Sequence, residues 1–166
     1  VTNDVARAFR LSTTEAEALK LQHGDAMVSA AGRTRRLPLP AAAGEAPRTA
    51  KLSDLQTIVH LRMEETFGLI AARLKRQKLL SLLGAGIVLT GGGAHLKNVA
   101  PLAEKVFGLP CEIGAPRNVS GLAANLAVPE YATGVGAVLH GYRSARAAAE
   151  RSRSAWKRLA HWFGVN

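Results

Sequence analysis

Three consecutive glycines, Gly91 to Gly93, are the residues with the clearest potential to hold a ligand. One threonine separates them from the apolar run 87–89, which is typical of a strand buried on both faces. Apolar residues then recur at helical spacing from Leu96 to Phe107. Because glycine has no Cβ and a helix N-terminus attracts anions, a ligand can approach this backbone closely. The strand, glycine turn and helix predict a nucleotide-phosphate or adenosine site.

The same turn is equally compatible with simple packing of a helix against a sheet. It lacks the Lys-Ser/Thr pair of a P-loop, and its glycine spacing differs from the dinucleotide fingerprint. We interpret His95, which follows the turn, as a helix-start residue rather than a catalyst. We assign no catalytic residue and no metal ligand from the sequence.

A second candidate lies in the first quarter of the chain, where Glu17 and Lys20 share one face of a predicted helix. The capping box Ser12-Thr13-Thr14-Glu15 starts this helix, which runs to about His23 and stops at Gly24. The simplest interpretation of Glu17 and Lys20 is a surface ion pair, and a role in a binding site remains open.

The charge balance indicates an acidic partner. The 166 residues carry a net charge of +10, 48% are hydrophobic, and no apolar run approaches the roughly 20 residues needed to span a bilayer. Neither zinc-finger spacing nor a basic region with heptads is present, so we expect no nucleic-acid partner. A single cysteine fits a reducing compartment. The first residue is Val rather than Met, so we expect a fragment or a processed chain.

The C-terminal segment predicts a membrane-binding helix. A charged, alanine-rich stretch, 143–153, precedes a basic segment that carries both tryptophans of the chain. Aromatic and apolar residues at helical spacing, flanked by basic residues, suit an anionic bilayer surface. The residues expected to contact the membrane are Trp156, Lys157, Arg158, Leu159, Trp162 and Phe163. The alternative is a terminal helix that docks on the core of the domain.

Between these segments the sequence predicts a small subdomain and an α/β unit. Residues 25–31 and 34–39 suggest a hairpin that turns at Gly32-Arg33, followed by an irregular loop to Pro47. A second capping box, 53–56, opens a long helix that ends near Leu80. A short strand is expected at 110–113, and Pro129 opens a last core helix. We attribute Gly134 and Gly136 in that helix to close packing on the sheet.

Six segments, taken together, resemble the FtsA family of bacterial actin-like cell-division proteins in order and spacing. They are residues 1–6, 16–20, 86–94, 113–122, 129–136 and 156–162. The resemblance covers the second half of the family's length, so the N-terminal lobe and its Asp-Gly-Gly-Gly-Thr phosphate motif are expected before Val1.

The resemblance implies an α/β fold, part of the C-terminal lobe of an actin-like ATPase (ribonuclease H-like), with a small α+β subdomain and a C-terminal amphipathic helix. The implied domains follow the chain. They are a partial nucleotide-binding subdomain of residues 1–23 and 81–142, a hairpin and long-helix subdomain of 24–80, a charged linker of 143–153, and a membrane-targeting helix of 154–166.

The resemblance also assigns roles to particular residues. Gly91, Gly92, Gly93 and Ala94 would bind ATP as its magnesium complex, with Glu17 and Lys20 facing the ribose and adenine. Arg62 and Glu65, on the long helix, would bind the C-terminal tail of FtsZ. Two departures from the family pattern stand out. Val59-His60-Leu61 replaces the usual Glu-Pro before Arg62, and Lys97-Asn98 stands where Pro-Gly is frequent.

The implied function is to tether FtsZ to the cytoplasmic face of the inner membrane at the division site and to self-associate into actin-like filaments. Any ATP hydrolysis would be weak and would need groups from the N-terminal lobe. Two alternatives remain open at this point: a sugar-kinase-like ATPase of the same superfamily, and an actin-like assembly protein of the type IV pilus system.

Overall fold

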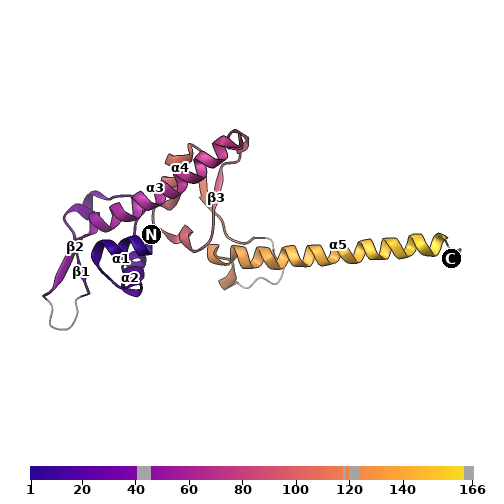
Figure 1. Ribbon diagram of the computed structural model, residues 1–166, viewed down its shortest axis with the longest axis horizontal. Coiled ribbons are helices and arrows are strands. Elements are labelled where there is room, and N and C mark those ends of the chain that lie inside the picture. Colours follow the sequence, from indigo (N-terminus) through magenta and orange to yellow (C-terminus); the bar gives the residue numbers. More distant parts are fainter. Residues whose placement is uncertain (41–45, 118, 120–123, 163–166) are drawn as a thin grey trace. The chain divides into compact units, whose positions relative to one another are not determined.

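The computed structural model describes residues 1–40, 46–117, 119 and 124–162, with only the helical backbone described for 152–162. The chain divides into two compact units, Val1–Gly114 and Ala115–Asn166, which we describe separately (Figure 1).

The first unit begins with two short helices, α1 (Thr2–Phe9) and α2 (Thr13–His23). The predicted capping box at the start of α2 is confirmed. The Ser12 hydroxyl accepts from the backbone N–H of Glu15, and the Ser12 N–H donates to the Glu15 carboxylate at 2.8 Å. The helix ends at Gly24, also as predicted, but Gly24 has φ −63° and lies in the extended region.

The hairpin differs from the prediction. Its strands are β1 (Arg36–Leu39) and β2 (Arg48–Lys51), paired antiparallel with Leu37 opposite Ala50. Residues 25–31, predicted as a strand, contain a single bridge, at Asp25, and the start of the 3-10 turn Ala30–Arg33. Hydrogen bonds to residues that are distant in the sequence hold this segment, so tertiary contacts rather than strand pairing determine its conformation. Asn98 binds Asp25, and Gln56 binds Ser29.

The longest helix of this unit, α3 (Leu52–Arg76), follows β2 without a break. The predicted capping box at 53–56 is wrong, because the helix starts at Leu52 and Ser53 already lies within it. Gln56, the expected capping partner, is 4% exposed, and its Oε1 accepts from the backbone N–H and the hydroxyl of Ser29 at 3.0 and 3.1 Å. The side chain of Gln56, which the sequence assigned to a helix cap, therefore binds Ser29 instead.

The α/β unit is found where the sequence placed it. Strands β3 (Ile87–Leu89) and β4 (Cys111–Ile113) pair in parallel, and α4 (Val99–Phe107) connects them. The expectation that β3 is buried on both faces is wrong for the described residues, because Val88 is 58% exposed. Ile87 and Leu89 pack toward the α4 core, so Val88 points to the opposite face of a sheet that has only two strands here.

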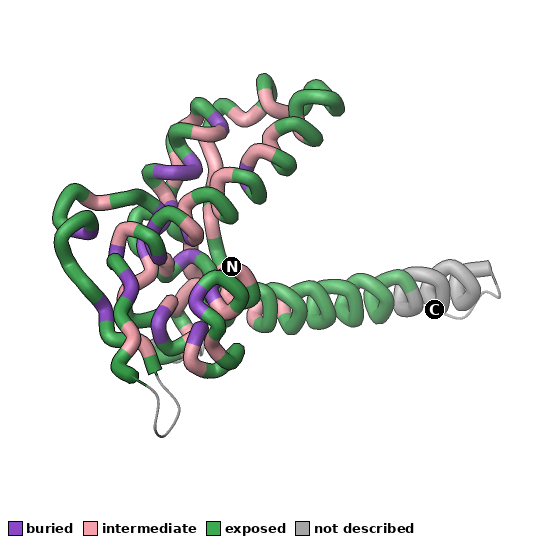
Figure 2. The backbone as a smooth tube through the Cα atoms, turned by 60° about the vertical axis from the view of Figure 1, so that its left-hand side comes forward, coloured by how far each residue is buried: buried purple, intermediate pink, exposed green. Residues whose placement is uncertain are grey.

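Two apolar clusters make up the core of the first unit, and α3 contributes to both. Figure 2 colours the buried residues purple. The first cluster joins α1, α2 and the hairpin to Leu55 and Val59 of α3. The second joins α4 to Phe67, whose ring centroid lies 5.7 Å from that of Phe107. The long helix thus connects the small subdomain to the α/β unit.

The second unit contains the 3-10 turns Ala124–Leu126 and Pro129–Tyr131 and the helix α5 (Ala132–Trp162). The helix predicted to open at Pro129 is present and continues without interruption through 143–153. Within this unit, a Cβ at Gly134 or Gly136 would meet no atom within 4 Å. The predicted close packing on the sheet, whose strands lie in the first unit, stays a prediction. Among the helices as described, none is both long and apolar enough to cross a bilayer.

The backbone conformation and surroundings of Gly86, just before β3, predict that a side chain there destabilises the fold. This residue has φ +88°, and an added Cβ would lie 2.5 Å from the carbonyl oxygen of Pro110, a backbone atom that also accepts from Ile87. We expect Gly86→Ala to lower the free energy of unfolding by about 1–3 kcal/mol. Urea unfolding followed by circular dichroism measures this change.

Gly84 provides the matched control for this substitution. It lies two residues earlier, its φ is negative, and a Cβ there meets open space. Gly84→Ala is expected to leave the free energy of unfolding nearly unchanged. Equal effects of the two substitutions would show that the Pro110 contact does not restrict Gly86.

Candidate functional site

The glycine turn presents bare backbone at the end of β3. Gly91 has φ +85°, a conformation that glycine adopts readily, and Gly92 begins the 3-10 turn Gly92–His95. Gly92 and Gly93 are exposed, and a Cβ at either would meet open space, whereas Ala94 is buried. The turn therefore leaves room for a ligand to approach its main chain directly.

The helix that follows starts later than the sequence predicted. α4 begins at Val99 rather than Leu96, and Asn98 precedes it with φ 57°. This left-handed conformation suits Asn or Gly, which explains how Asn98 can stand where the resembled family often has Gly. Its side-chain amide donates to both carboxylate oxygens of Asp25, at 2.8 and 3.0 Å.

Asp25 places a negative charge beside the start of α4. It is 2% exposed, and it also accepts from the backbone N–H of Met27 at 2.8 Å and lies 3.7 Å from the Lys97 ammonium. Because a buried carboxylate already lies there, we expect an anionic ligand to bind at the glycine turn rather than at the N-terminus of α4.

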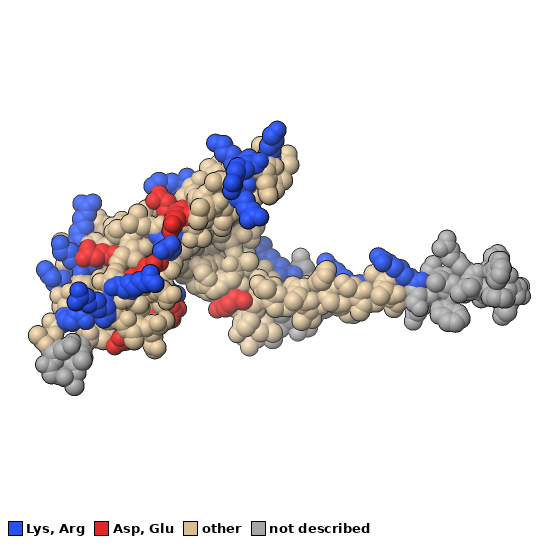
Figure 3. Space-filling view, in the orientation of Figure 1, with Lys and Arg blue, Asp and Glu red and all other residues tan. Residues whose placement is uncertain are grey.

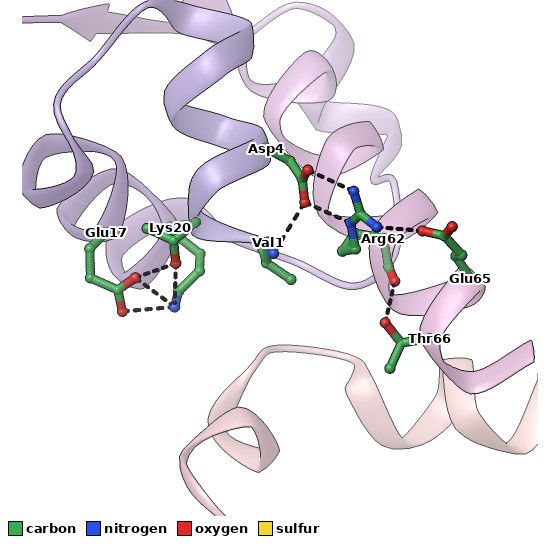
Figure 4. Close-up of polar contacts among 8 residues, drawn as sticks. Val1, Asp4, Glu17, Lys20, Arg62, Glu65 and Thr66 are labelled. Atoms are coloured by element: carbon green, nitrogen blue, oxygen red, sulfur yellow. Dashed lines mark hydrogen bonds and ion pairs between the residues drawn. The ribbon is translucent and has the colours of Figure 1, made fainter. Parts of the chain in front are cut away.

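Glu17 and Lys20 form the ion pair that the sequence predicted, with an Nζ–Oε1 distance of 2.7 Å (Figure 4). The hydroxyl of Thr2, from α1, donates to the Glu17 carboxylate at 2.6 Å. The hydrogen bond from Lys20, followed by the one from Thr2, lowers the pKa of Glu17 below its ordinary value. The carboxylate thus stays ionised, as an acceptor for hydroxyl donors.

The end of α2 and the residues just after it contact the segment that follows the glycine turn. The N–H of Ala26 donates to the carbonyl oxygen of Lys97 at 2.8 Å. A Cβ on Gly24 would lie 3.4 Å from the Leu96 side chain, so the end of α2 packs against this segment. The two sets of residues expected at a nucleotide site therefore belong to one packed unit.

A groove of about 640 Å³ lies between α1 and α3 and contains both residues predicted for partner binding, Arg62 and Glu65. The other lining residues are Asp4, Arg7, Ala8, Ile58 and Leu61. The sequence analysis missed all five. The helical spacing of residues 58, 61, 62 and 65 indicates that they share one face of α3. Nothing in the sequence indicates that this face lies against α1.

Arg62 is held by carboxylates on both sides (Figure 4). Its Nε and Nη2 donate to the two oxygens of Asp4, each at 2.7 Å, and its Nη1 donates to Glu65 at 2.6 Å. The hydrogen bond from Arg62 is the largest cause that lowers the pKa of Asp4, from its ordinary 3.8 to about 2.

Basic residues gather at the C-terminal end of α3 (Figure 3). Arg73, Lys75 and Arg76 occupy its last turn, Lys78 follows, and all four are exposed. Their positive charges interact favourably with the negative end of the helix dipole. In the part of the chain that the structure describes, no group of His, Cys, Asp and Glu is arranged to hold a metal ion.

The predicted membrane-binding residues lie at the end of α5. The backbone is helical through Trp162, which includes Trp156, Lys157, Arg158 and Leu159. Phe163 lies outside the described residues. The one ion pair described along 143–153 joins Arg146 to Glu150 at 3.0 Å, which is consistent with a solvated helix.

Comparison with known proteins identifies relatives over most of the chain. The family model described as "Cell division protein FtsA" matches residues 1–136. The FtsA of Pseudomonas aeruginosa is 37% identical over 141 residues, which cover 85% of this chain and 34% of that protein. The FtsA of Escherichia coli is 35% identical over 151 residues, covering 87% and 36%. The chain thus spans about a third of the length of these relatives.

Among solved structures, MreB5 of Spiroplasma citri bound to ADP matches with a TM-score of 0.54 and 19% identity, over 68% of this chain and 37% of that one. The same protein bound to AMPPNP matches with a TM-score of 0.53 and 20% identity, over the same shares. These similarities support the predicted fold, part of an actin-like ATPase.

The Asp4–Arg62 contact predicts how the pKa of Asp4 changes when Arg62 is replaced. In an NMR titration, we expect the Asp4 carboxyl to have a pKa of about 2, and Arg62→Gln to raise it toward the ordinary 3.8. Because the folded-state pKa is depressed, Asp4 stabilises the fold above about pH 4, and this contribution is lost as the pH falls toward 2.

The Glu15 carboxyl is the internal control for this titration. Its pKa is lowered by hydrogen bonds from Ser12, which Arg62 does not contact. The pKa of Glu15 should therefore be the same in both proteins. An unchanged pKa of Asp4 in Arg62→Gln would contradict the bidentate contact.

Proposed function

The chain belongs to the FtsA family of cell division proteins, and we propose that it is the nucleotide- and partner-binding portion of a protein that tethers FtsZ to the cytoplasmic membrane. The observation that carries this proposal is the family match over residues 1–136, which contains both the glycine turn and the α1–α3 groove. A sugar-kinase or pilus-assembly role receives no comparable support.

We assign ATP, as its magnesium complex, to the surface formed by the glycine turn and α2. The open backbone at Gly92 and Gly93 fits the approach of a phosphate or adenosine, with Ala94 at the end of the turn. Glu17 is suited to accept from ribose hydroxyls, with Lys20 on the adenine side. Since the chain spans about a third of its relatives, further nucleotide contacts would come from the remaining sequence.

We assign the C-terminal tail of FtsZ to the groove between α1 and α3. Ile58 and Leu61 supply apolar surface, while Arg62 and Arg7 supply positive charge. Such a lining fits a peptide that combines apolar and acidic side chains. Glu65, whose side chain is 56% exposed, also accepts from the Arg62 guanidinium.

We assign the end of α5 to the anionic inner surface of the cell membrane at the division site. Both tryptophans lie in this part of the helix, with Lys157 and Arg158 between them in the sequence. Aromatic side chains beside basic ones bind the interface without crossing it. Self-association into actin-like filaments, in line with the fold, would then array these helices along the membrane.

The groove assignment predicts that a synthetic FtsZ tail peptide binds the chain and that Arg62→Gln weakens binding about tenfold, because it removes the main cationic donor. Fluorescence anisotropy with labelled peptide measures the affinity. Glu64→Gln is the control, because Glu64 contacts His60 and does not line the groove. Equal affinity of all three proteins would contradict the assignment.

The membrane assignment predicts co-sedimentation with vesicles that contain phosphatidylglycerol but not with phosphatidylcholine vesicles. Truncation after Ser152 should abolish binding, because it removes the tryptophans and the adjacent charges. A double variant, Trp156→Ala with Trp162→Ala, keeps the charge and should also lose binding. Sedimentation of the truncated chain with anionic vesicles would contradict the assignment.

The nucleotide assignment predicts that this chain alone binds ATP weakly, since it supplies only part of the cleft. Titration calorimetry should detect no tight, stoichiometric complex at micromolar ATP. Lys20→Gln in the longer protein should weaken ATP binding, whereas Lys105→Gln, on α4, should leave it unchanged. Tight binding by the 166-residue chain would show that the cleft is complete without further sequence.

A further inference from the structure

In the groove between α1 and α3, an acidic residue of the chain itself already binds Arg62. Arginine binds a carboxylate most strongly through the fork formed by Nε and one Nη, because two parallel hydrogen bonds match the carboxylate geometry. In this structure Asp4 fills that fork at 2.7 Å on both nitrogens. An acidic side chain that enters the groove therefore finds the best position on Arg62 already taken.

Asp4 is attached to the opposite wall of the groove from Arg62. It lies on α1, 58 residues before Arg62 in the sequence, whereas Arg62 and Glu65 both lie on α3. Glu65 accepts only from Nη1, which is outside the fork. Of the two acids that line the groove, Asp4 is thus the one that competes directly for bidentate binding.

We propose that Asp4 is a built-in competitor that sets the affinity and specificity of the groove for acidic segments. An incoming carboxylate replaces Asp4 on the Nε–Nη2 fork of Arg62, while an apolar side chain of the same segment lies against Ile58 and Leu61. This inference rests on the groove as the FtsZ-tail site of the proposed function and adds a determinant to it.

The exchange is feasible because the pair is partly hydrated. The Asp4 side chain is 24% exposed and that of Arg62 is 43% exposed, so Asp4 can be resolvated when it is displaced. Releasing Asp4 still has a cost, which reduces the affinity of every acidic ligand. Neutral segments do not need the fork, so Asp4 lowers the affinity of acidic ligands and leaves that of neutral ligands unchanged.

The test measures peptide affinity by fluorescence anisotropy for the wild-type chain, Asp4→Asn and Glu64→Gln. Both variants remove one negative charge, but only Asp4→Asn removes the bidentate carboxylate from the fork of Arg62. The probes are the FtsZ tail peptide, its version with each Asp and Glu changed to the amide, and an unrelated peptide of leucines flanked by glutamates. Thermal melts verify that each variant is folded.

We expect Asp4→Asn to bind the acidic peptides about two- to fivefold more tightly than either the wild type or Glu64→Gln. Its affinity for the neutral peptide should equal that of the wild type. In the background of Arg62→Gln the effect of Asp4→Asn should vanish, because the fork is absent.

The outcomes separate this inference from the proposed function. If no protein binds the FtsZ tail but Asp4→Asn gains affinity for the glutamate-flanked peptide, the FtsZ assignment fails and the competitor role stands. If Asp4→Asn binds neither acidic peptide more tightly than the wild type, the competitor role is overturned. That result holds whether or not the FtsZ tail binds.

Discussion

The packing of α3 against two separate apolar clusters is the constraint on which the first unit depends. Leu55 and Val59 face the cluster shared with α1, α2 and the hairpin, while Phe67 meets Phe107 in the cluster shared with α4. A single helix of 25 residues is long enough to reach both. Every site described in this unit is therefore positioned relative to one rigid element.

A second connection joins the same two parts by hydrogen bonds. The buried Asp25 carboxylate is satisfied by the Asn98 amide and the Met27 N–H, and the main chain of Ala26 bonds to Lys97. Burying an ionised carboxylate is costly unless it is paired and hydrogen-bonded, so this arrangement depends on all of its partners. It fixes α2 beside the segment that follows the glycine turn.

The packing of α1 against α3 determines which charged side chains meet in the groove. α1 and α3 meet along the first cluster, and at its edge Asp4 and Arg62 come within hydrogen-bonding distance. Since the guanidinium is held on both sides, its position is defined before any partner arrives. In contrast, α5 is largely exposed over the residues described, with Val138 and Tyr142 at 73% and 65% exposure.

The sequence by itself determined the elements whose signals are local. The capping box of α2, the parallel α/β unit around the glycines, the Glu17–Lys20 pair and the helix from Pro129 all follow from spacing within a few residues. Family membership also followed from motifs in order along the chain. Only the tertiary structure decided the second strand of the hairpin, the start of α3, the exposure of Val88 and the contact of Asp4 with Arg62. These features depend on which residues far apart in the chain come into contact, as Ser29 does with Gln56 and Asp4 with Arg62, or on a face left without such a neighbour, as at Val88. Local periodicity carries no information about such partners.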